Sequence, residues 1–184
     1  MDMEEEFQRL DRELVYKGTV VDFYKDTVQT PAGHIVKWDF IGHRGAAAVV
    51  PVREDGKLLM VRQYRNALDR YTLEIPAGGL NEEGDEPSRL AAARELEEET
   101  GYRSDDLELL LTIHTTVAFC NERIDIYLAR NLVKSEQHLD EDEFIKVEAY
   151  SPEELAQMIL EGRIQDSKTI SAVLAYKEKY LREL

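Results

Sequence analysis

The sequence contains little cysteine, tryptophan, proline and positive charge. Its 184 residues include one cysteine, one tryptophan and five prolines, and 23 lysines and arginines stand against 38 aspartates and glutamates. The lone Cys120 cannot form an intrachain disulfide, which excludes a disulfide-stapled scaffold and favours a reducing, cytoplasmic location. The shortage of basic residues excludes a protein whose main task is to neutralise the phosphates of nucleic acid.

Long hydrophobic runs are also missing. No apolar stretch approaches the ~18 residues that a membrane-spanning helix needs. Acidic residues, rather than a basic and then apolar segment, follow Met1, so we expect neither a membrane protein nor a secreted one. With 43% hydrophobic residues the chain can still bury a core, and its length suits one domain, or one domain with a small appendage.

Negative charge is abundant and concentrated in two blocks. Residues 81–108 hold 11 acids and 3 bases, and residues 135–154 hold 8 acids and 1 base, so these segments account for the whole net charge of −15. Acidic residues that serve only solubility would be spread along the chain. The concentration of negative charge in residues 81–108 therefore indicates a specific role for that segment. We interpret the second block as a solvated acidic loop.

Hydrophobic periodicity predicts strands and helices that interleave irregularly, as in a mixed sheet flanked by helices. Residues 1–44 are expected to form two strands around a turn at 30–33. A second hairpin is expected from 45–52 and 57–64. The further strands are expected at 71–75, 107–117, 124–129 and 144–150, and the helices at 88–99, from Ser151, and at 167–184.

Acidic residues share one face of the predicted helix at 88–99. At about 100° per residue, Glu98 and Glu99 lie within about 60° of Glu95, whereas Glu97 points to the other side. Three carboxylates so close repel one another, and a divalent cation with oxygen ligands, most simply Mg²⁺, would offset that repulsion. The alternative for a bare glutamate cluster is a solvated helix face.

The context of the cluster resembles a known motif. Glu86, followed by Arg94-Glu95-Leu96-x-Glu98-Glu99-x-Gly101-Tyr102, is similar to the Nudix box, and the segments 61–65 and 73–78 resemble the ADP-ribose pyrophosphatase branch of that family. The resemblance implies an α+β fold of the α/β/α sandwich type, with a mixed sheet between helices and a small N-terminal β-sheet. It also implies a domain division into residues 1–44 and 45–184.

The resemblance assigns the metal ligands and the reaction. Glu95, Glu98, Glu99 and the carbonyl of Ala77 match the metal ligands, with Mg²⁺ as the cofactor and Mn²⁺ as a substitute, and Arg94 matches the arginine that orients the glutamates. The implied reaction is attack of metal-activated water on the pyrophosphate of ADP-ribose or a related nucleoside diphosphate sugar, giving a nucleoside monophosphate and a sugar phosphate.

Two positions depart from the family pattern. Leu80 stands where the box has glycine, which indicates a longer loop around Gly78 and Gly79. Thr116-Val117-Ala118 stands where ADP-ribose enzymes usually have Ser-Pro-Gly. The second departure leaves other substrates open, among them GDP-mannose, UDP-glucose and NADH.

Glu122 is the candidate general base, because residues 119–123 resemble the loop that supplies a glutamate in this branch. Its alternative role is that of a surface carboxylate paired with Arg123 or placed in a turn. Glu98 is a second candidate for the base.

The substrate contacts are expected from four residues. Arg65 or Arg62 should reach the diphosphate, although a spacing of three places both on one strand face only across a bulge, and the alternative is a surface salt bridge. Trp38 could stack on adenine or belong to the core. Glu74 could hydrogen-bond the nucleotide or join the metal site.

The resemblance further implies a homodimer in which the N-terminal strands pair or swap and complete the partner's site. Residues 1–44 would expose sheet edges if left alone. Two other classes of function stay open: a Nudix-fold sensor that binds a nucleotide without turnover, and an acidic protein that buffers cations or binds a partner. The intact glutamate set favours the hydrolase over the sensor.

Overall fold

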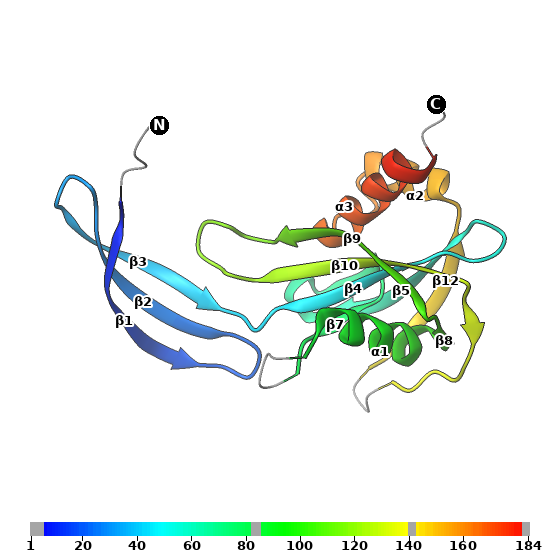
Figure 1. The fold of residues 1–184 in the computed structure, drawn as a ribbon, viewed down its shortest axis with the longest axis horizontal. Helices are drawn as coiled ribbons and strands as arrows, with labels where there is room; N and C mark the ends of the chain where they lie inside the picture. Colours follow the sequence, from blue (N-terminus) through cyan, green and yellow to red (C-terminus); the bar gives the residue numbers. More distant parts are fainter. Residues whose placement is uncertain (1–5, 82–85, 140–142, 182–184) are drawn as a thin grey trace.

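The computed structural model describes residues 6–81, 86–139 and 143–181. These residues form three α-helices, two sheets and a two-stranded ribbon beside a separate N-terminal sheet (Figure 1). The central sheet has the strand order β7-β4-β10-β9. Strands β4 and β10 run parallel and the other neighbours antiparallel, so the sheet is mixed, as predicted. The strands are β4 (Ala46–Pro51), β7 (Ala77–Gly79), β9 (Asp106–His114) and β10 (Arg123–Arg130).

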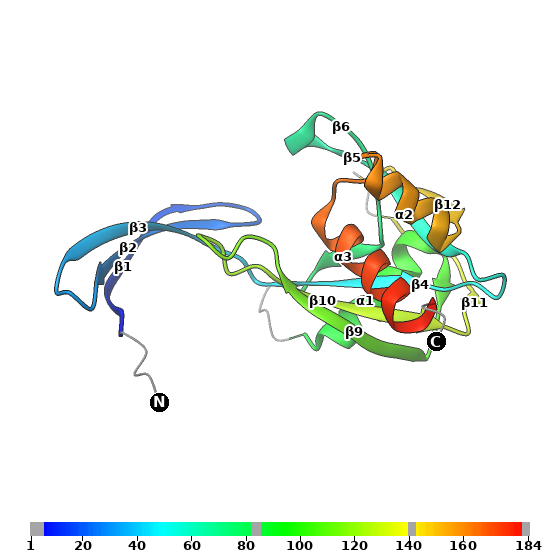
Figure 2. The same cartoon turned by 90° about the horizontal axis from the view of Figure 1, so that it is seen from above.

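Helices cover both faces of the central sheet (Figures 1 and 2). Along β4, Ala47 and Val49 pack against α1 (Ser88–Thr100). Ala48 and Val50 belong to the core shared with α2 (Pro152–Leu160) and α3 (Ser167–Tyr176). Because successive side chains of a strand point to opposite faces, a strand buried on both sides reads as a continuous apolar run. This arrangement confirms the predicted α/β/α sandwich.

A second sheet, of order β12-β5-β6, lies beside the central one. Its strands are β5 (Leu58–Arg65), β6 (Arg70–Glu74) and β12 (Lys146–Tyr150), with a 3₁₀ turn, Asn66–Leu68, between β5 and β6. The predicted hairpin of β4 and β5 is therefore wrong beyond its turn: only Val52 and Leu58 form a bridge. Both edges of β4 are occupied by β7 and β10, so β5 pairs elsewhere.

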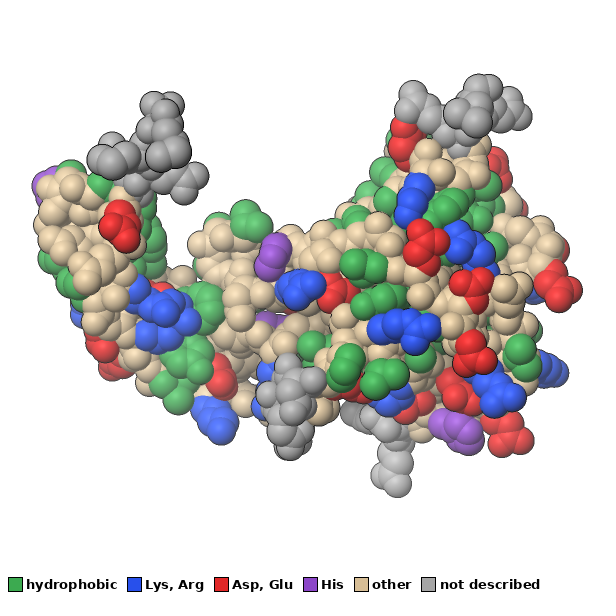
Figure 3. Space-filling model, viewed as in Figure 1, with side chains coloured by type: hydrophobic (Ala, Val, Ile, Leu, Met, Phe, Trp, Pro, Cys, Tyr) green, Lys and Arg blue, Asp and Glu red, His purple; other side chains and the backbone are tan. Residues whose placement is uncertain are grey.

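The N-terminal sheet has three strands, where the sequence pattern indicated two. They are β1 (Gln8–Lys17), β2 (Asp22–Gln29) and β3 (Ile35–Gly42). The predicted turn joins β2 to β3, with Gly33 at a φ of 82°. Figures 1 and 2 show this sheet standing away from the rest of the molecule, and Figure 3 shows a broad concavity between the two parts.

The helix boundaries follow their capping residues. Gly101, at a φ of 70°, ends α1, and Ser151 with Glu154 forms the predicted capping box of α2 (Pro152–Leu160). Asp166 caps α3 (Ser167–Tyr176), which continues as a π-helical turn, Lys177–Leu181. A two-stranded ribbon of β8 (Tyr102–Arg103) and β11 (Val133–Lys134) completes the fold. Among the described residues, no helix is long and apolar enough to cross a membrane.

Candidate functional site

The site begins where β7 passes the acidic face of α1. Strand β7 pairs with β4, which brings Ala77 and Gly78 to the helix. A Cβ atom on Gly78 would lie 2.0 Å from Oε1 of Glu95, whereas one on Gly79 would meet nothing within 4 Å. Gly78 is therefore needed for the close approach of the Glu95 carboxylate to the backbone.

Arg94 links the carboxylates of the motif, as its predicted orienting role requires. Its Nη1 donates to Glu95 at 2.7 Å and to Glu98 at 2.9 Å. Its Nη2 donates to Glu86 at 3.3 Å and to the carbonyl of Gly79 at 3.2 Å. One guanidinium thus fixes three acids relative to the β7 backbone.

Glu97 points away from Arg94 and the carboxylates that it holds, as helical geometry predicts. Glu97 accepts a 2.5 Å hydrogen bond from Ser135, in the segment that opens the second acidic block. The same segment runs over the end of α1, where the Gln137 side chain donates to the Glu99 carbonyl at 2.6 Å. The start of the second block, residues 135–138, therefore contacts the site helix through hydrogen bonds.

The buried carboxylates favour a bound cation. Burial raises the pKa of Glu95 to about 7, and burial together with the charge of Glu95 raises that of Glu99 to about 8. Glu99 is 2% exposed and accepts a hydrogen bond from the Ala77 amide at 3.0 Å. Clustered carboxylate oxygens beside a backbone carbonyl are the donor set that Mg²⁺ and similar hard cations prefer.

The residue types at this site are therefore those that bind a divalent cation, but their side chains do not converge on one point. Within the described part of the chain, no three His, Cys, Asp or Glu side chains converge closely enough to hold a metal ion. Arg94 draws Glu95 and Glu98 to itself, and Glu99 faces the Ala77 amide. Metal binding would require these carboxylates to turn toward a common point.

Two adjoining cavities, which we call the cleft, open beside β7. Both are lined by Arg65, Glu122, Ile124 and Lys168. One extends to Ala77 and Gly78, and the other to Thr72, Glu74 and Asp166. The predicted residues Ala77, Arg65, Glu74 and Glu122 are thus brought to one place from four segments of the chain.

Glu122 lies in the cleft beside a histidine that the sequence analysis did not single out. Its Oε1 is 3.6 Å from Nε2 of His43, and its Oε2 accepts from Thr115 at 2.5 Å. Nδ1 of His43 accepts from the Gly45 amide at 3.0 Å. In the neutral imidazole the proton therefore sits on Nε2, which faces Glu122.

The two predicted arginines lie on opposite faces of β5. Pairing between β5 and β6 runs without a register shift, so no bulge brings Arg62 and Arg65 together. Arg65 donates to Glu74 at 2.8 and 2.7 Å in the cleft. Arg62 donates to Glu148 of β12 at 3.0 and 3.1 Å. The structure thus separates Arg62 from the other candidate residues.

Trp38 also lies apart from the cleft of its own chain. It is half-exposed on β3, with its ring centroid 5.8 Å from that of Phe7. It lines neither of the two cavities that form the cleft. A core role is excluded by its exposure, and any contact with a ligand in this chain's cleft would need a different arrangement of the N-terminal sheet.

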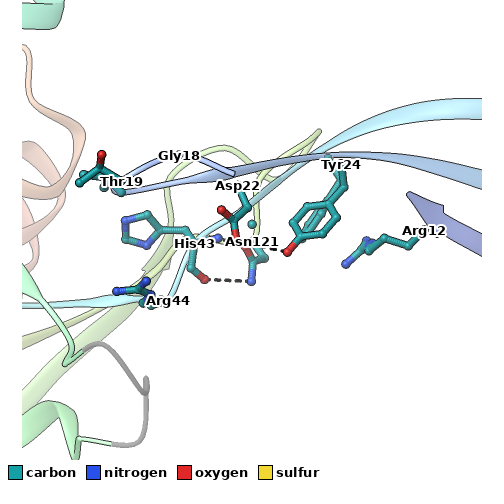
Figure 4. A pocket seen from close by; sticks show the side chains of 11 residues that line it. Arg12, Gly18, Thr19, Asp22, Tyr24, His43, Arg44 and Asn121 are labelled. Atoms are coloured by element: carbon teal, nitrogen blue, oxygen red, sulfur yellow. Dashed lines mark hydrogen bonds between the residues drawn. The ribbon is translucent and has the colours of Figure 1, made fainter. Parts of the chain in front are cut away.

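A separate pocket lies where the N-terminal sheet meets the domain (Figure 4). Figure 4 shows His43 and Asn121 joined at its wall: the His43 amide donates to Asn121 Oδ1 at 2.7 Å, and Asn121 Nδ2 donates to the His43 carbonyl at 3.2 Å. Arg12 and Arg44 face the pocket from either side. The loop that carries Glu122 is thus tied to the end of β3.

The two departures from the motif have different structural outcomes. Leu80 packs over Gly45 and joins the small apolar cluster of Ala47, Ala91 and Tyr127 beside α1, which gives this side chain a structural role. The detail of the following loop lies outside the described residues. Thr116 lines the cleft, whereas Val117 is 84% exposed in the turn before Glu122.

Sequence reasoning missed three residues at the site. Besides His43, they are Lys168 of α3, which donates to Glu74, and Glu143, whose charge raises the pKa of both Glu95 and Glu99. Glu143 belongs to the acidic block 135–154, and that charge excess was its only signal. His43 and Lys168 belong to no local motif, because only the folded chain brings them to the cleft.

Comparison with known proteins agrees with the motif. A methanol dehydrogenase activator of Bacillus methanolicus is 43% identical over 163 residues, which cover 88% of this chain and 87% of that protein. An ADP-ribose pyrophosphatase of Bacillus subtilis is 38% identical over 164 residues, covering 88% of each chain. An ADP-ribose pyrophosphatase of Mycobacterium tuberculosis is 35% identical over 175 residues, covering 94% of this chain and 84% of that one.

The fold has a close counterpart among solved structures. The crystal structure of an ADP compounds hydrolase superposes with a TM-score of 0.84 over 97% of this chain and 96% of that chain, at 19% identity. The NUDIX domain family model matches residues 42–173, from the end of β3 into α3. With the box carboxylates, their orienting arginine and the sandwich fold in place, the chain belongs to the Nudix family.

Proposed function

We propose that this protein hydrolyses the pyrophosphate of ADP-ribose or a related nucleoside diphosphate sugar, giving a nucleoside monophosphate and a sugar phosphate. The carrying observation is that β7 brings Ala77 and Gly78 against the box carboxylates at the edge of a cleft that also holds Arg65 and Glu122. The relatives named ADP-ribose pyrophosphatase, at 38% and 35% identity, support the choice of substrate.

A divalent cation, Mg²⁺ or its substitute Mn²⁺, would be held by Glu95, Glu98, Glu99 and the Ala77 carbonyl. When bound, this ion would polarise water and neutralise charge that develops on the phosphate oxygens. Arg94 keeps the glutamates in position, and Arg65 presents its guanidinium to the diphosphate. Water adds its oxygen to one phosphorus, the bond to the bridging oxygen breaks, and that oxygen leaves on the other phosphate.

A carboxylate accepts the proton of the attacking water, and three candidates are available: Glu122, Glu143 and Glu98. Glu122 lies in the cleft with His43, and Glu143 lies near enough to Glu95 and Glu99 to raise the pKa of both. Glu122→Gln and Glu143→Gln separate them. Loss of the base lowers kcat by about 10²–10⁴-fold with little change in KM. A similar small loss in both variants would instead favour Glu98.

One assay tests the proposed reaction. The protein is incubated with Mg²⁺ and ADP-ribose, GDP-mannose, UDP-glucose, NADH, diadenosine polyphosphates or 8-oxo-dGTP, and release of the monophosphate is followed. Turnover of ADP-ribose that is lost in Glu99→Gln supports the proposal. Binding of a nucleotide without turnover of any compound would favour the sensor, and full activity of Glu99→Gln would contradict the metal assignment.

A second candidate function comes from the relative named methanol dehydrogenase activator, which is 43% identical to this chain. In this second function the protein acts on a dehydrogenase or together with one. It does so either in addition to hydrolysing free nucleotide sugars or instead of hydrolysing them. Adding it to a methanol dehydrogenase with and without Mg²⁺ tests this candidate. A dehydrogenase rate unchanged by the protein would exclude it for that enzyme.

We further propose that residues 1–44 form a dimerisation subdomain and residues 45–184 the hydrolase domain. Large apolar side chains on the N-terminal sheet and in the segments beside its strands are exposed, namely those of Phe7, Leu10, Leu14, Val15, Tyr16, Val20, Val21, Ile35 and Trp38. Such a patch is typical of an interface between chains, and the partner's Trp38-bearing strand could then reach the cleft. The lone Cys120 is compatible with a cytoplasmic location.

Sedimentation at micromolar concentration tests the dimer. We expect twice the 21.2 kDa mass of one chain. Leu14→Glu places a charge on the exposed sheet and should yield monomers. Leu160→Glu, on a leucine of α2 that is more exposed than Leu14, should not. A wild-type monomer would contradict the proposal.

A further inference from the structure

Lys168 is a buried lysine at the floor of the cleft. Its side chain is 10% exposed, and its Nζ donates to the carboxylate of Glu74 and, at 3.0 Å, to that of Asp166. Lysine is rarely buried in this way unless it is paired. The residue comes from α3, far from the box in sequence, and neither the motif nor the reaction described above uses it.

Glu74 connects Lys168 to the predicted substrate-binding arginine. Its side chain is 2% exposed and accepts both bonds of the Arg65 fork, at 2.8 and 2.7 Å, and a 2.6 Å bond from Thr72. Burial by itself would raise the pKa of Glu74, but Arg65 and Lys168 hold it at about 2. The carboxylate is therefore charged and is shared between two cations.

This sharing decides how much positive charge Arg65 can offer a ligand. Glu74 engages Nε and Nη2 of Arg65, which leaves Nη1 for a ligand in the cleft. Without Lys168, the guanidinium would be the only cation in contact with Glu74 and would be neutralised by it, while Asp166 would lose its own cation. The floor of the cleft would then become more negative by one charge and repel an anion.

We propose that Lys168 is a positioning residue for substrate binding, which neutralises Glu74 so that Arg65 remains oriented and electropositive toward the diphosphate. The identity of the substrate in this proposal rests on the proposed function. The presence of an arginine that binds a diphosphate does not.

The backbone around Lys168 holds it at this position. Asp166 caps α3 by accepting from the Thr169 amide at 3.0 Å, and the hydroxyl of Thr169 accepts from the Ile75 amide at 2.9 Å. The first turn of α3 is thus fastened to the end of β6, directly beside Glu74. Lys168 is consequently a fixed part of the cleft and not a mobile surface lysine.

Lys168→Met tests the proposal, because it keeps the length of the side chain and removes its charge. Two experiments are done in Mg²⁺: calorimetry gives the Kd for inorganic pyrophosphate, and steady-state kinetics give KM and kcat for ADP-ribose. We expect Kd and KM to rise about tenfold, the effect of weakening one charged contact, with kcat within about twofold of wild type. The matched control is Lys177→Met, whose ion pair with Glu153 is on the surface, and it should change neither.

The double variant Glu74→Gln/Lys168→Met distinguishes the role in binding from a general role in folding. With no charge on residue 74 to neutralise, loss of Lys168 should weaken pyrophosphate binding less than it does in the presence of Glu74. A Lys168→Met protein with a lower Tm but wild-type Kd and KM would overturn the proposal, as would a wild type that does not bind pyrophosphate. If pyrophosphate binding depends on Lys168 but ADP-ribose is not hydrolysed, the proposed function fails and the positioning role stands.

Discussion

At the residue scale, Gly78 and Gly79 make a matched pair. A methyl group on Gly78 would overlap the Glu95 carboxylate, whereas one on Gly79 would enter open space. Gly78→Ala must therefore displace a predicted metal ligand, and we expect kcat/KM to fall about tenfold to a hundredfold, as for other changes that disturb ligand positioning. Gly79→Ala should stay within about twofold, and equal effects in the two variants would show that Glu95 need not approach the backbone.

Glu74 gives the protein an acid sensitivity that can be measured directly. Burial opposes its charge, yet Arg65 and Lys168 lower its folded-state pKa from an ordinary 4.5 to about 2. Ionised Glu74 therefore adds about 3 kcal/mol to the free energy of unfolding above pH 4.5. This contribution is lost as the pH falls toward 2. Denaturant unfolding between pH 6 and 2 should show a shallower loss for Glu74→Gln than for wild type, because the variant lacks this titrating group.

At the scale of elements, α2 should be separable from function. Ser151 accepts from the Glu154 amide at 3.2 Å, and Glu154 accepts from the Ser151 amide at 2.7 Å. Neither residue of this capping box lines the cleft. Ser151→Ala should reduce the free energy of unfolding by about 1 kcal/mol and Tm by roughly 2–4 °C. KM and kcat should remain those of wild type; a fall in kcat would show that α2 contributes to the site.

At the scale of the whole molecule, the net charge of −15 predicts that a cation mediates the binding of an anionic substrate. The box carboxylates repel a diphosphate until a divalent ion neutralises part of their charge. ADP-ribose should therefore bind at least about tenfold more tightly with Mg²⁺ than with a chelator. Glu98→Gln should reduce this difference, and equal affinity in both conditions would contradict the idea.

Local sequence predicted the elements well where the determining forces are local. The helix at 88–99 and the capping box at Ser151 were confirmed, because propensity and capping act within a few residues. The pairing of strands was predicted less well. The expected β4–β5 hairpin separates into two sheets, and one N-terminal strand was missed, because strand partners are decided by contacts that are distant in sequence.

The sequence by itself determined the family, the sandwich of helices around a mixed sheet, and the helix face that carries Glu95, Glu98 and Glu99, because these follow from a contiguous motif and from helical geometry. Only the tertiary structure decided that Arg62 lies away from the site and that Glu143 lies near the box glutamates. It also decided that Glu74 binds both Arg65 and Lys168. Strand register and the docking of α3 fix those relations. Both depend on packing between segments that no local pattern connects.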